Sequence, residues 1–103
     1  MISEAECGLD HTTQSALIKV FKQHPGIDSV LLYGSRAKGN FKEGSDIDLA
    51  LVGPTLTIKE MLKTQGEIDD LLLPYKVDVT LSHAIDNPEL AEHISRVGRL
   101  LYP

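Results

Sequence analysis

Apolar residues recur at helical spacing in three segments of the chain. A first helix is predicted over residues 12–24, a second begins at a capping box formed by Thr57 and Glu60, and a third begins at Asn87. Gly66 interrupts the second helical pattern and is expected to bend or break that helix. The residues that define the three apolar faces are Leu17, Val20 and Phe21, then Ile58, Met61, Leu62, Ile68 and Leu72, and finally Leu90, Ile94, Val97 and Leu101.

Three shorter runs of β-branched and aliphatic residues predict strands. These runs cover residues 27–33, 46–52 and 76–81, and glycine or proline punctuates the chain between them. The predicted order is therefore α-β-β-α-β-α. Residues 1–9 show no periodicity, so we expect a flexible lead-in there, and no role for Cys7.

The composition narrows the class of protein. The chain has 103 residues, 42% of them hydrophobic and 24% charged, which fits one globular domain over residues 1–103. Its formal net charge of −5, with no run of lysine or arginine, argues against tight binding to nucleic acid. There is no apolar run of membrane-spanning length, no signal-peptide pattern and only one cysteine, so we expect a cytoplasmic protein without an internal disulfide.

Two carboxylates stand where the second strand begins. Asp46 and Asp48 are two residues apart, so on a strand both side chains leave the same face. Folding alone gives no reason to place two like charges together at the mouth of a buried strand, whereas Mg²⁺ prefers such oxygen ligands. Asp78 lies between Val77 and Val79 in the third strand, and it is the candidate for a third acid. This pattern indicates magnesium-dependent nucleotidyl transfer, with two metal ions as in other phosphoryl-transfer sites.

A turn between the first two strands could hold the phosphates of a nucleotide. Gly34 permits close approach of a phosphate to the backbone, and the Ser35 hydroxyl can donate to a phosphate oxygen. The basic residues Arg36, Lys38 and Lys42 follow, either as phosphate contacts or as a solvated turn. Ser45 could cap the turn or hold a metal-bound water. The histidines His11, His24, His83 and His93 show no metal-ligand spacing and are expected to be surface or cap residues.

Taken together, these residues resemble a known signature. Gly34-Ser35, ten residues, then Asp46-Ile47-Asp48 is similar to the DNA polymerase beta-like nucleotidyltransferase superfamily, and Tyr33 to Gly39 together with the ending Val97 to Tyr102 resemble its smallest branch, the minimal nucleotidyltransferases. The resemblance implies a mixed α+β fold, with a small sheet of at least three strands, helices mainly on one face and the metal site on the other. It implies Asp46, Asp48 and Asp78 as metal ligands and catalytic acids, and Gly34 and Ser35 as the phosphate-binding turn.

The resemblance also implies a partner. Proteins of this branch pair with an all-helical HEPN protein as antitoxin and toxin, and their proposed activity is transfer of AMP from ATP to a toxin side chain, usually tyrosine. Two alternatives stay open: an antitoxin that neutralises its toxin by complex formation and uses the nucleotide only as a ligand, and transfer to a small molecule. The short chain disfavours transfer to a small molecule, because a domain of this length is expected to take its acceptor site from a partner.

Overall fold

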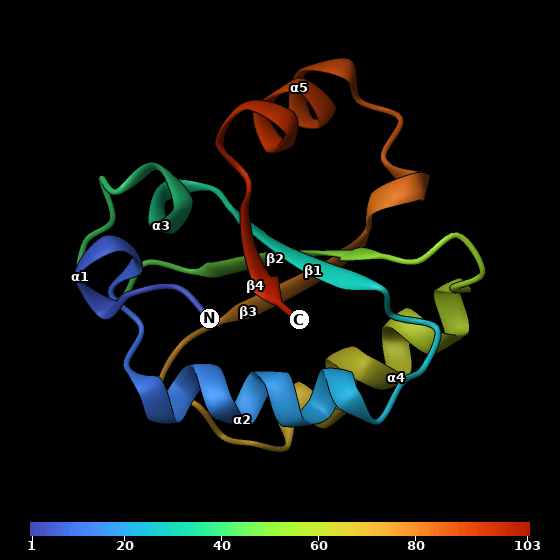
Figure 1. Ribbon diagram of the computed structural model, residues 1–103, viewed down its shortest axis with the longest axis horizontal. Coiled ribbons are helices and arrows are strands. Elements are labelled where there is room, and N and C mark those ends of the chain that lie inside the picture. The colour runs from blue at the N-terminus through green and yellow to red at the C-terminus, as the bar shows by residue number, and fades with distance from the viewer.

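Four strands form one mixed sheet in the computed structural model, which describes residues 1–103 (Figure 1). At its centre β1 (Ser29–Tyr33) pairs antiparallel with β2 (Ile47–Val52). On one side β3 (Val77–Leu81) runs parallel to β2, and on the other β4 (Arg99–Tyr102) runs antiparallel to β1, which gives the order β3-β2-β1-β4. The three predicted strands are confirmed, each beginning one or two residues later than the sequence pattern predicts.

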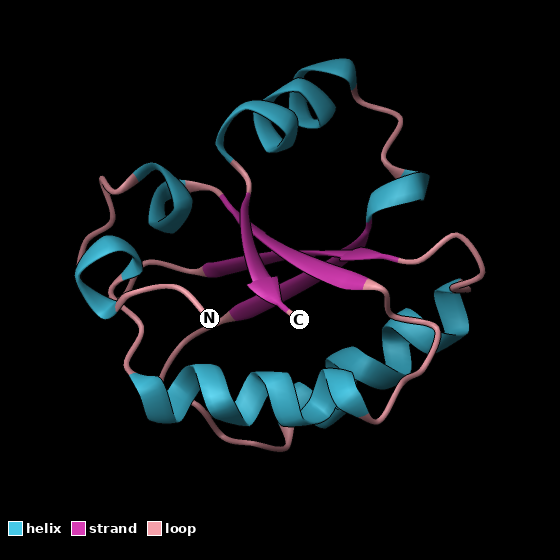
Figure 2. Ribbon diagram, viewed as in Figure 1, coloured by secondary structure: helices cyan, strands magenta, loops and turns pink.

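Helices lie on both sides of this sheet, with the two longest on the same side (Figures 1 and 2). The elements are α1 (Glu4–Cys7), α2 (His11–Lys22), α3 (Ser35–Lys38), α4 (Ile58–Asp69), a 3-10 turn η1 (Ser82–Ala84) and α5 (Pro88–Val97). The helices α2 and α4 pack against one face, whereas α5 lies on the opposite side. The predicted α+β fold with a mixed sheet is therefore confirmed.

The hydrophobic core lies between the sheet and these two long helices. Alternate residues of the central strands point into it, and the largest of them, Leu32, Leu49 and Leu51, are fully buried. Leu17 and Phe21 of α2 pack against them and are equally inaccessible. Each such side chain contributes about 1.5–3 kcal/mol by burial. Because one face of the central strands is buried in this core, only the opposite face can carry a functional site.

The predicted flexible lead-in is wrong. Ser3 caps α1, and Cys7 at its end is completely buried in the core cluster. Gln14 of α2, only 1% exposed, accepts from the Ile2 N–H at 2.8 Å and donates to the Ile2 and Leu9 carbonyl oxygens. These bonds fasten the first residues to α2, and sequence periodicity could not show them because they join positions up to twelve residues apart.

The predicted last helix also extends too far. It ends at Val97, and the residues expected to continue its apolar face form β4 instead. Gly98 makes this exit possible, because a Cβ there would lie 2.4 Å from the Ile94 carbonyl oxygen. Leu101 has helical spacing from Val97, but it is buried as part of a strand that pairs with distant β1. The non-local pairing outweighs the local pattern.

The inward face of α4 differs from the predicted one. Met61 packs against the core cluster and Ile68 belongs to it, whereas Ile58 and Leu62 are 63% and 60% exposed. Thr64 takes the inward position, because its hydroxyl is satisfied by the Glu60 carbonyl oxygen at 2.9 Å. The predicted interruption at residue 66 does not occur, since α4 runs through to Asp69. Leu72, expected on the same face, follows the helix and is almost fully exposed.

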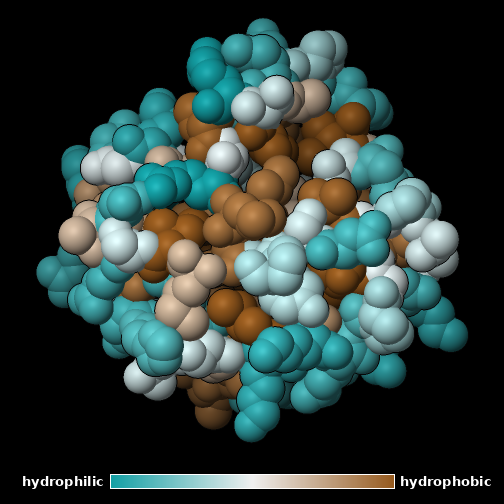
Figure 3. All heavy atoms as spheres, viewed as in Figure 1, coloured by the Kyte–Doolittle hydropathy of each residue, from teal (hydrophilic) through white to brown (hydrophobic).

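The surface is mixed in character. In the space-filling view, apolar side chains gather at the centre of the face that carries β4, with polar ones around them (Figure 3). Leu100 of β4 contributes exposed apolar surface, with 52% of the residue accessible. No helix combines the length and the apolar character that crossing a membrane requires.

Candidate active site

Three side chains from three adjacent strands form a row on the face of the sheet opposite the core. Asp48 pairs with Tyr33 of β1 on one side and with Asp78 of β3 on the other. Their neighbours along the strands, such as Leu49, point into the core, so the row points away from it. Asp46 lies just before β2 and is exposed. We call Asp46, Asp48 and Asp78 the carboxylate cluster.

The negative charges of the carboxylate cluster repel one another. Burial raises the pKa of the Asp48 carboxyl, and the charges of Asp78 and Asp46 raise that pKa further. His93 and Lys76 act in the opposite direction. The Lys76 ammonium lies 3.8 Å from Asp78 Oδ2, but both side chains are largely solvated, so this ion pair offsets little of the repulsion.

The pKa of Tyr33 is also affected by the carboxylate cluster. Burial raises the pKa of its phenol, and the carboxylates of Asp48 and Asp78 raise it as well. The neutral hydroxyl is therefore favoured beside the carboxylate cluster.

The Gly34 turn lies against Asp48. Gly34 has φ +76° and ψ −157°, a conformation that favours glycine, and a Cβ on it would lie 2.4 Å from Asp48 Oδ2. Ser35 begins α3 directly afterwards and is half-buried. The structure thus brings the predicted phosphate turn and a predicted metal ligand into contact, although they are fourteen positions apart in the sequence.

Arg36 does not fit either of the two expected roles, phosphate contact or solvated turn. It is only 2% exposed, and its guanidinium donates to the Ser45 carbonyl oxygen at 3.1 and 2.8 Å and to the Cys7 carbonyl oxygen at 3.0 Å. It also lies over the rings of Phe41 and Tyr75, at 5.4 and 4.9 Å from their centroids. A guanidinium engaged in this way holds the loop to α1 rather than a ligand.

The two lysines of the loop are free to contact a phosphate. Lys38 and Lys42 are exposed, while the Ser45 hydroxyl accepts from the Lys42 N–H at 2.8 Å. Ser45 therefore caps the turn, which is one of its two expected roles.

Sequence reasoning missed His93. Its Nε2 accepts from the Gly34 N–H at 3.1 Å, and its ring stands edge-on to Tyr33 with centroids 6.3 Å apart. One signal could have found it, because residue 93 lies three positions after Leu90 and four before Val97, on the inward stripe of α5.

The chemistry of the carboxylate cluster suits a divalent cation, but its geometry does not form a ready-made ligand set. No three His, Cys, Asp or Glu side chains lie close enough together to hold a metal ion in this arrangement. The cluster instead lies across neighbouring strands, about 4.8 Å apart. Carboxylate oxygens are the ligands that Mg²⁺ prefers, and a cation would offset the repulsion that raises the Asp48 pKa.

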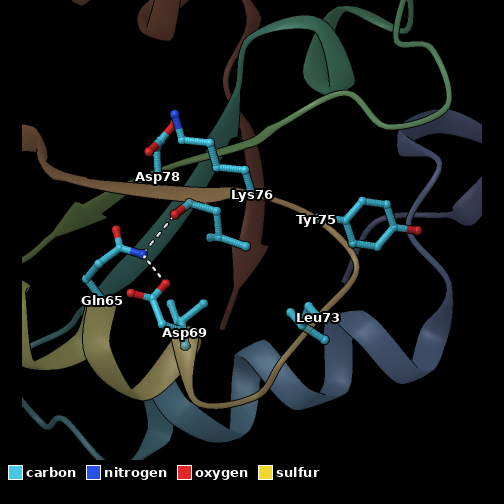
Figure 4. A pocket seen from close by; sticks show the side chains of 8 residues that line it. Gln65, Asp69, Leu73, Tyr75, Lys76 and Asp78 are labelled. Atoms are coloured by element: carbon cyan, nitrogen blue, oxygen red, sulfur yellow. Dashed lines mark hydrogen bonds and ion pairs between the residues drawn. The ribbon is translucent and has the colours of Figure 1, made fainter.

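A pocket of about 430 Å³ opens at the edge of β3, beside Asp78 (Figure 4). Gln65 forms part of its wall: its amide donates to the Val77 carbonyl oxygen at 2.8 Å and accepts from the Val79 N–H at 3.0 Å. These are the bonds that a further strand would make, so Gln65 occupies the open edge of the sheet. Leu73 and Tyr75 supply apolar surface to the same pocket.

The sequence model of the family described as "Polymerase beta, Nucleotidyltransferase" matches residues 15–103. A Methanocaldococcus jannaschii protein named "Putative protein adenylyltransferase MJ1547" is 33% identical over 69% of this chain. The match spans 66% of that relative's length.

The fold is shared with several solved structures. A toxin-antitoxin structure with AMP-PNP superposes with a TM-score of 0.69 and 22% identity, over 85% of this chain and 71% of the other. The structure of a tri-AMPylated Shewanella oneidensis HEPN toxin in complex with an MNT antitoxin matches with a TM-score of 0.67 and 19% identity, over 90% of this chain and 71% of the other.

Proposed function

This chain belongs to the polymerase beta nucleotidyltransferase family, and we propose that it transfers AMP from ATP to a hydroxyl group of a partner protein. The observation that carries the proposal is the contact between the Gly34 turn and Asp48, within a row that also contains Asp78. A phosphate chain on the turn would lie beside carboxylates that can hold its counter-ion. The relative named as an adenylyltransferase supports AMP as the group transferred.

Each residue has a role in the proposed reaction. Asp46, Asp48 and Asp78 would hold Mg²⁺, with two ions expected, and the metal would neutralise phosphate charge and activate the acceptor hydroxyl. Gly34 and Ser35 would donate to the phosphate chain and orient it. Asp78 is at the β3 edge, on the far side of Asp48 from the turn, which suits an acceptor arriving from that edge.

The bonds change as follows. The acceptor oxygen attacks the α-phosphorus of ATP while its proton passes to Asp78. The bond from the α-phosphorus to the oxygen bridging the α- and β-phosphates breaks, and pyrophosphate leaves. The product is an adenylylated hydroxyl, for which we propose a tyrosine side chain of a HEPN toxin, in keeping with the AMPylated toxin of the Shewanella complex.

Labelled ATP tests this proposal. The protein, Mg²⁺ and its HEPN partner are incubated with ATP labelled at either the α- or the γ-phosphate. Label on the partner from the α position alone, lost in Asp46→Asn and retained in Asp70→Asn, is the expected result. Asp70 is a matched control because it is exposed at the end of α4, outside the carboxylate cluster. Label from the γ position would indicate a kinase, and label from neither would remove the proposed activity.

A second candidate function is neutralisation of the toxin by binding alone. The exposed Ile58 and Leu62 of α4 favour it, because a partner protein could bind this apolar surface without any catalytic step. The double variant Asp46→Asn, Asp48→Asn separates the two functions in a growth assay with the toxin. Survival of neutralisation would favour binding, and its loss would favour transfer.

A further inference from the structure

The His93 imidazole occupies a hydrogen-bond donor that the proposed function assigns to the nucleotide. Its Nε2 accepts from the Gly34 N–H at 3.1 Å. A backbone N–H of this kind makes one good hydrogen bond at a time. In the free chain the Gly34 donor is therefore taken, and a phosphate oxygen can accept from it only when His93 withdraws.

The surroundings of Gly34 show why this donor belongs to the candidate active site. Gly34 lies between two groups, the Asp48 carboxylate on one side and the His93 imidazole on the other. The Asp48 carboxylate fills the space in the direction of a Cβ, whereas the N–H points to His93 Nε2. Because an acceptor must lie close to the direction of the N–H bond, a ligand oxygen that accepts from Gly34 must take the place of His93 Nε2.

The helix that carries His93 is attached lightly. Of the ten residues in α5, only Ile94 is buried, and both ends of the helix leave into exposed or half-buried backbone at Asn87 and Gly98. Segments with few buried apolar contacts open at low free-energy cost. The hydrogen bond to Gly34 and the edge-on contact with Tyr33 are therefore a sizeable part of what holds α5 against β1.

We propose that His93 is a residue of the nucleotide site that competes with the nucleotide: it accepts from the Gly34 N–H in the free chain and gives up that donor to a phosphate oxygen when ATP binds. This inference rests on the proposed function, and it adds a component that neither the family signature nor the carboxylate cluster contains. Nucleotide binding and displacement of His93 are then a single event. The apparent affinity for the nucleotide is therefore lower than the intrinsic affinity of the open turn, by the free energy of the contact that must break.

Two substitutions at residue 93 test the proposal. His93→Leu fills similar space but offers no acceptor, whereas His93→Gln places an amide oxygen near the position of Nε2 and can still accept from Gly34. The measurement is the Kd of a non-hydrolysable ATP analogue with Mg²⁺ by isothermal titration calorimetry. We expect His93→Leu to bind about two- to tenfold more tightly than the wild type, and His93→Gln to bind like the wild type, because one neutral hydrogen bond is being released or kept.

An amide spectrum provides the second measurement. The Gly34 ¹H–¹⁵N signal should move when the wild type binds the nucleotide, and it should already be moved in free His93→Leu. Far-UV circular dichroism of each variant checks that α5 remains helical.

Each outcome decides between the claims. If the wild type binds the nucleotide and His93→Leu binds equally or less tightly, the competition is refuted while the proposed function stands. An unmoved Gly34 signal upon binding refutes it as well. If neither the wild type nor the variants bind the nucleotide, the proposed function falls and this inference falls with it.

Discussion

Gly34 and Asp48 are in contact: a Cβ on residue 34 would lie 2.4 Å from the Asp48 Oδ2 atom. The first residue of the phosphate turn and the carboxylate at the start of β2 are therefore neighbours, and only glycine at position 34 leaves room for the carboxylate. This contact joins the two halves of the sequence signature into a single site.

Gly34→Ala should abolish the proposed transfer. The added methyl must displace the Asp48 carboxylate, and the positive φ costs about 1–3 kcal/mol of stability in addition. We expect adenylyl transfer to fall at least a hundredfold, on the order of what displaced catalytic groups cost. Gly39→Ala is the control, because Gly39 also has a positive φ (+84°) but has no atom within 4 Å of its Cβ position. Equal activity in the two variants would contradict the assigned role of the contact.

Asp48→Asn should stabilise the fold at neutral pH while removing activity. The pKa of the Asp48 carboxyl is raised in the folded protein by burial, by Asp78 and by Asp46, so its ionised form destabilises the folded state. This cost is fully present above the raised pKa, shrinks as the pH falls through that pKa, and is gone below the ordinary value of 3.8, where the carboxyl is protonated in both states.

Urea unfolding of the variant and the wild type between pH 7 and pH 4 measures this difference. We expect the variant to have the larger free energy of unfolding at pH 7, by a margin that shrinks on acidification. Asp70→Asn, at an exposed position on another element, should show no such trend. A margin that is constant or grows as the pH falls would contradict the electrostatic account.

Arg36 should contribute to stability rather than to nucleotide binding. Arg36→Ala leaves the Cys7 and Ser45 carbonyl oxygens without their charged donor, so we expect a loss of about 3 kcal/mol or more in urea unfolding. Arg36→Lys should recover little, since an ammonium cannot reproduce the planar fork of donors. Lys38→Ala, at the exposed neighbouring position, should change stability by about 0.5 kcal/mol at most. An Arg36→Ala protein of normal stability with weakened nucleotide binding would restore the phosphate-contact role.

Gln65 should protect the edge of the sheet. Gln65→Ala frees the Val77 carbonyl and the Val79 N–H at the edge of β3, and we expect a loss of about 1–2 kcal/mol in stability. The freed edge should also increase self-association in sedimentation velocity, because unpaired strand edges recruit further strands. Gln23→Ala, on the exposed end of α2, serves as the reference. A monomeric variant with unchanged stability would remove this role from Gln65.

Much of the candidate site could be predicted because its signals are local. The two-residue spacing of Asp46 and Asp48 is enough to place both side chains on one face once a strand is predicted there. Asp78 can be singled out as soon as β3 is predicted to be a strand, because it is the charged residue between two valines. Glycine at position 34 likewise indicates a turn that the backbone itself demands.

The remaining features depend on contacts between distant segments. The buried Arg36 guanidinium donates to the Cys7 carbonyl oxygen, twenty-nine positions away in the sequence, and His93 accepts from Gly34, fifty-nine positions away. The strand β4 exists because β1 offers it an edge, although its residues continue a helical pattern. No window along the sequence contains both members of such pairs.

The measurement that tests the central claim most directly is the intact mass of the HEPN partner after incubation with this protein, ATP and Mg²⁺. Three samples are compared: the wild type, Asp48→Asn and the control Asp70→Asn. We predict that the partner gains whole adenylyl groups with the wild type and with the control, and none with Asp48→Asn. A partner of unchanged mass in all three samples, or one adenylylated equally by Asp48→Asn, would contradict the assignment of transfer to the carboxylate cluster.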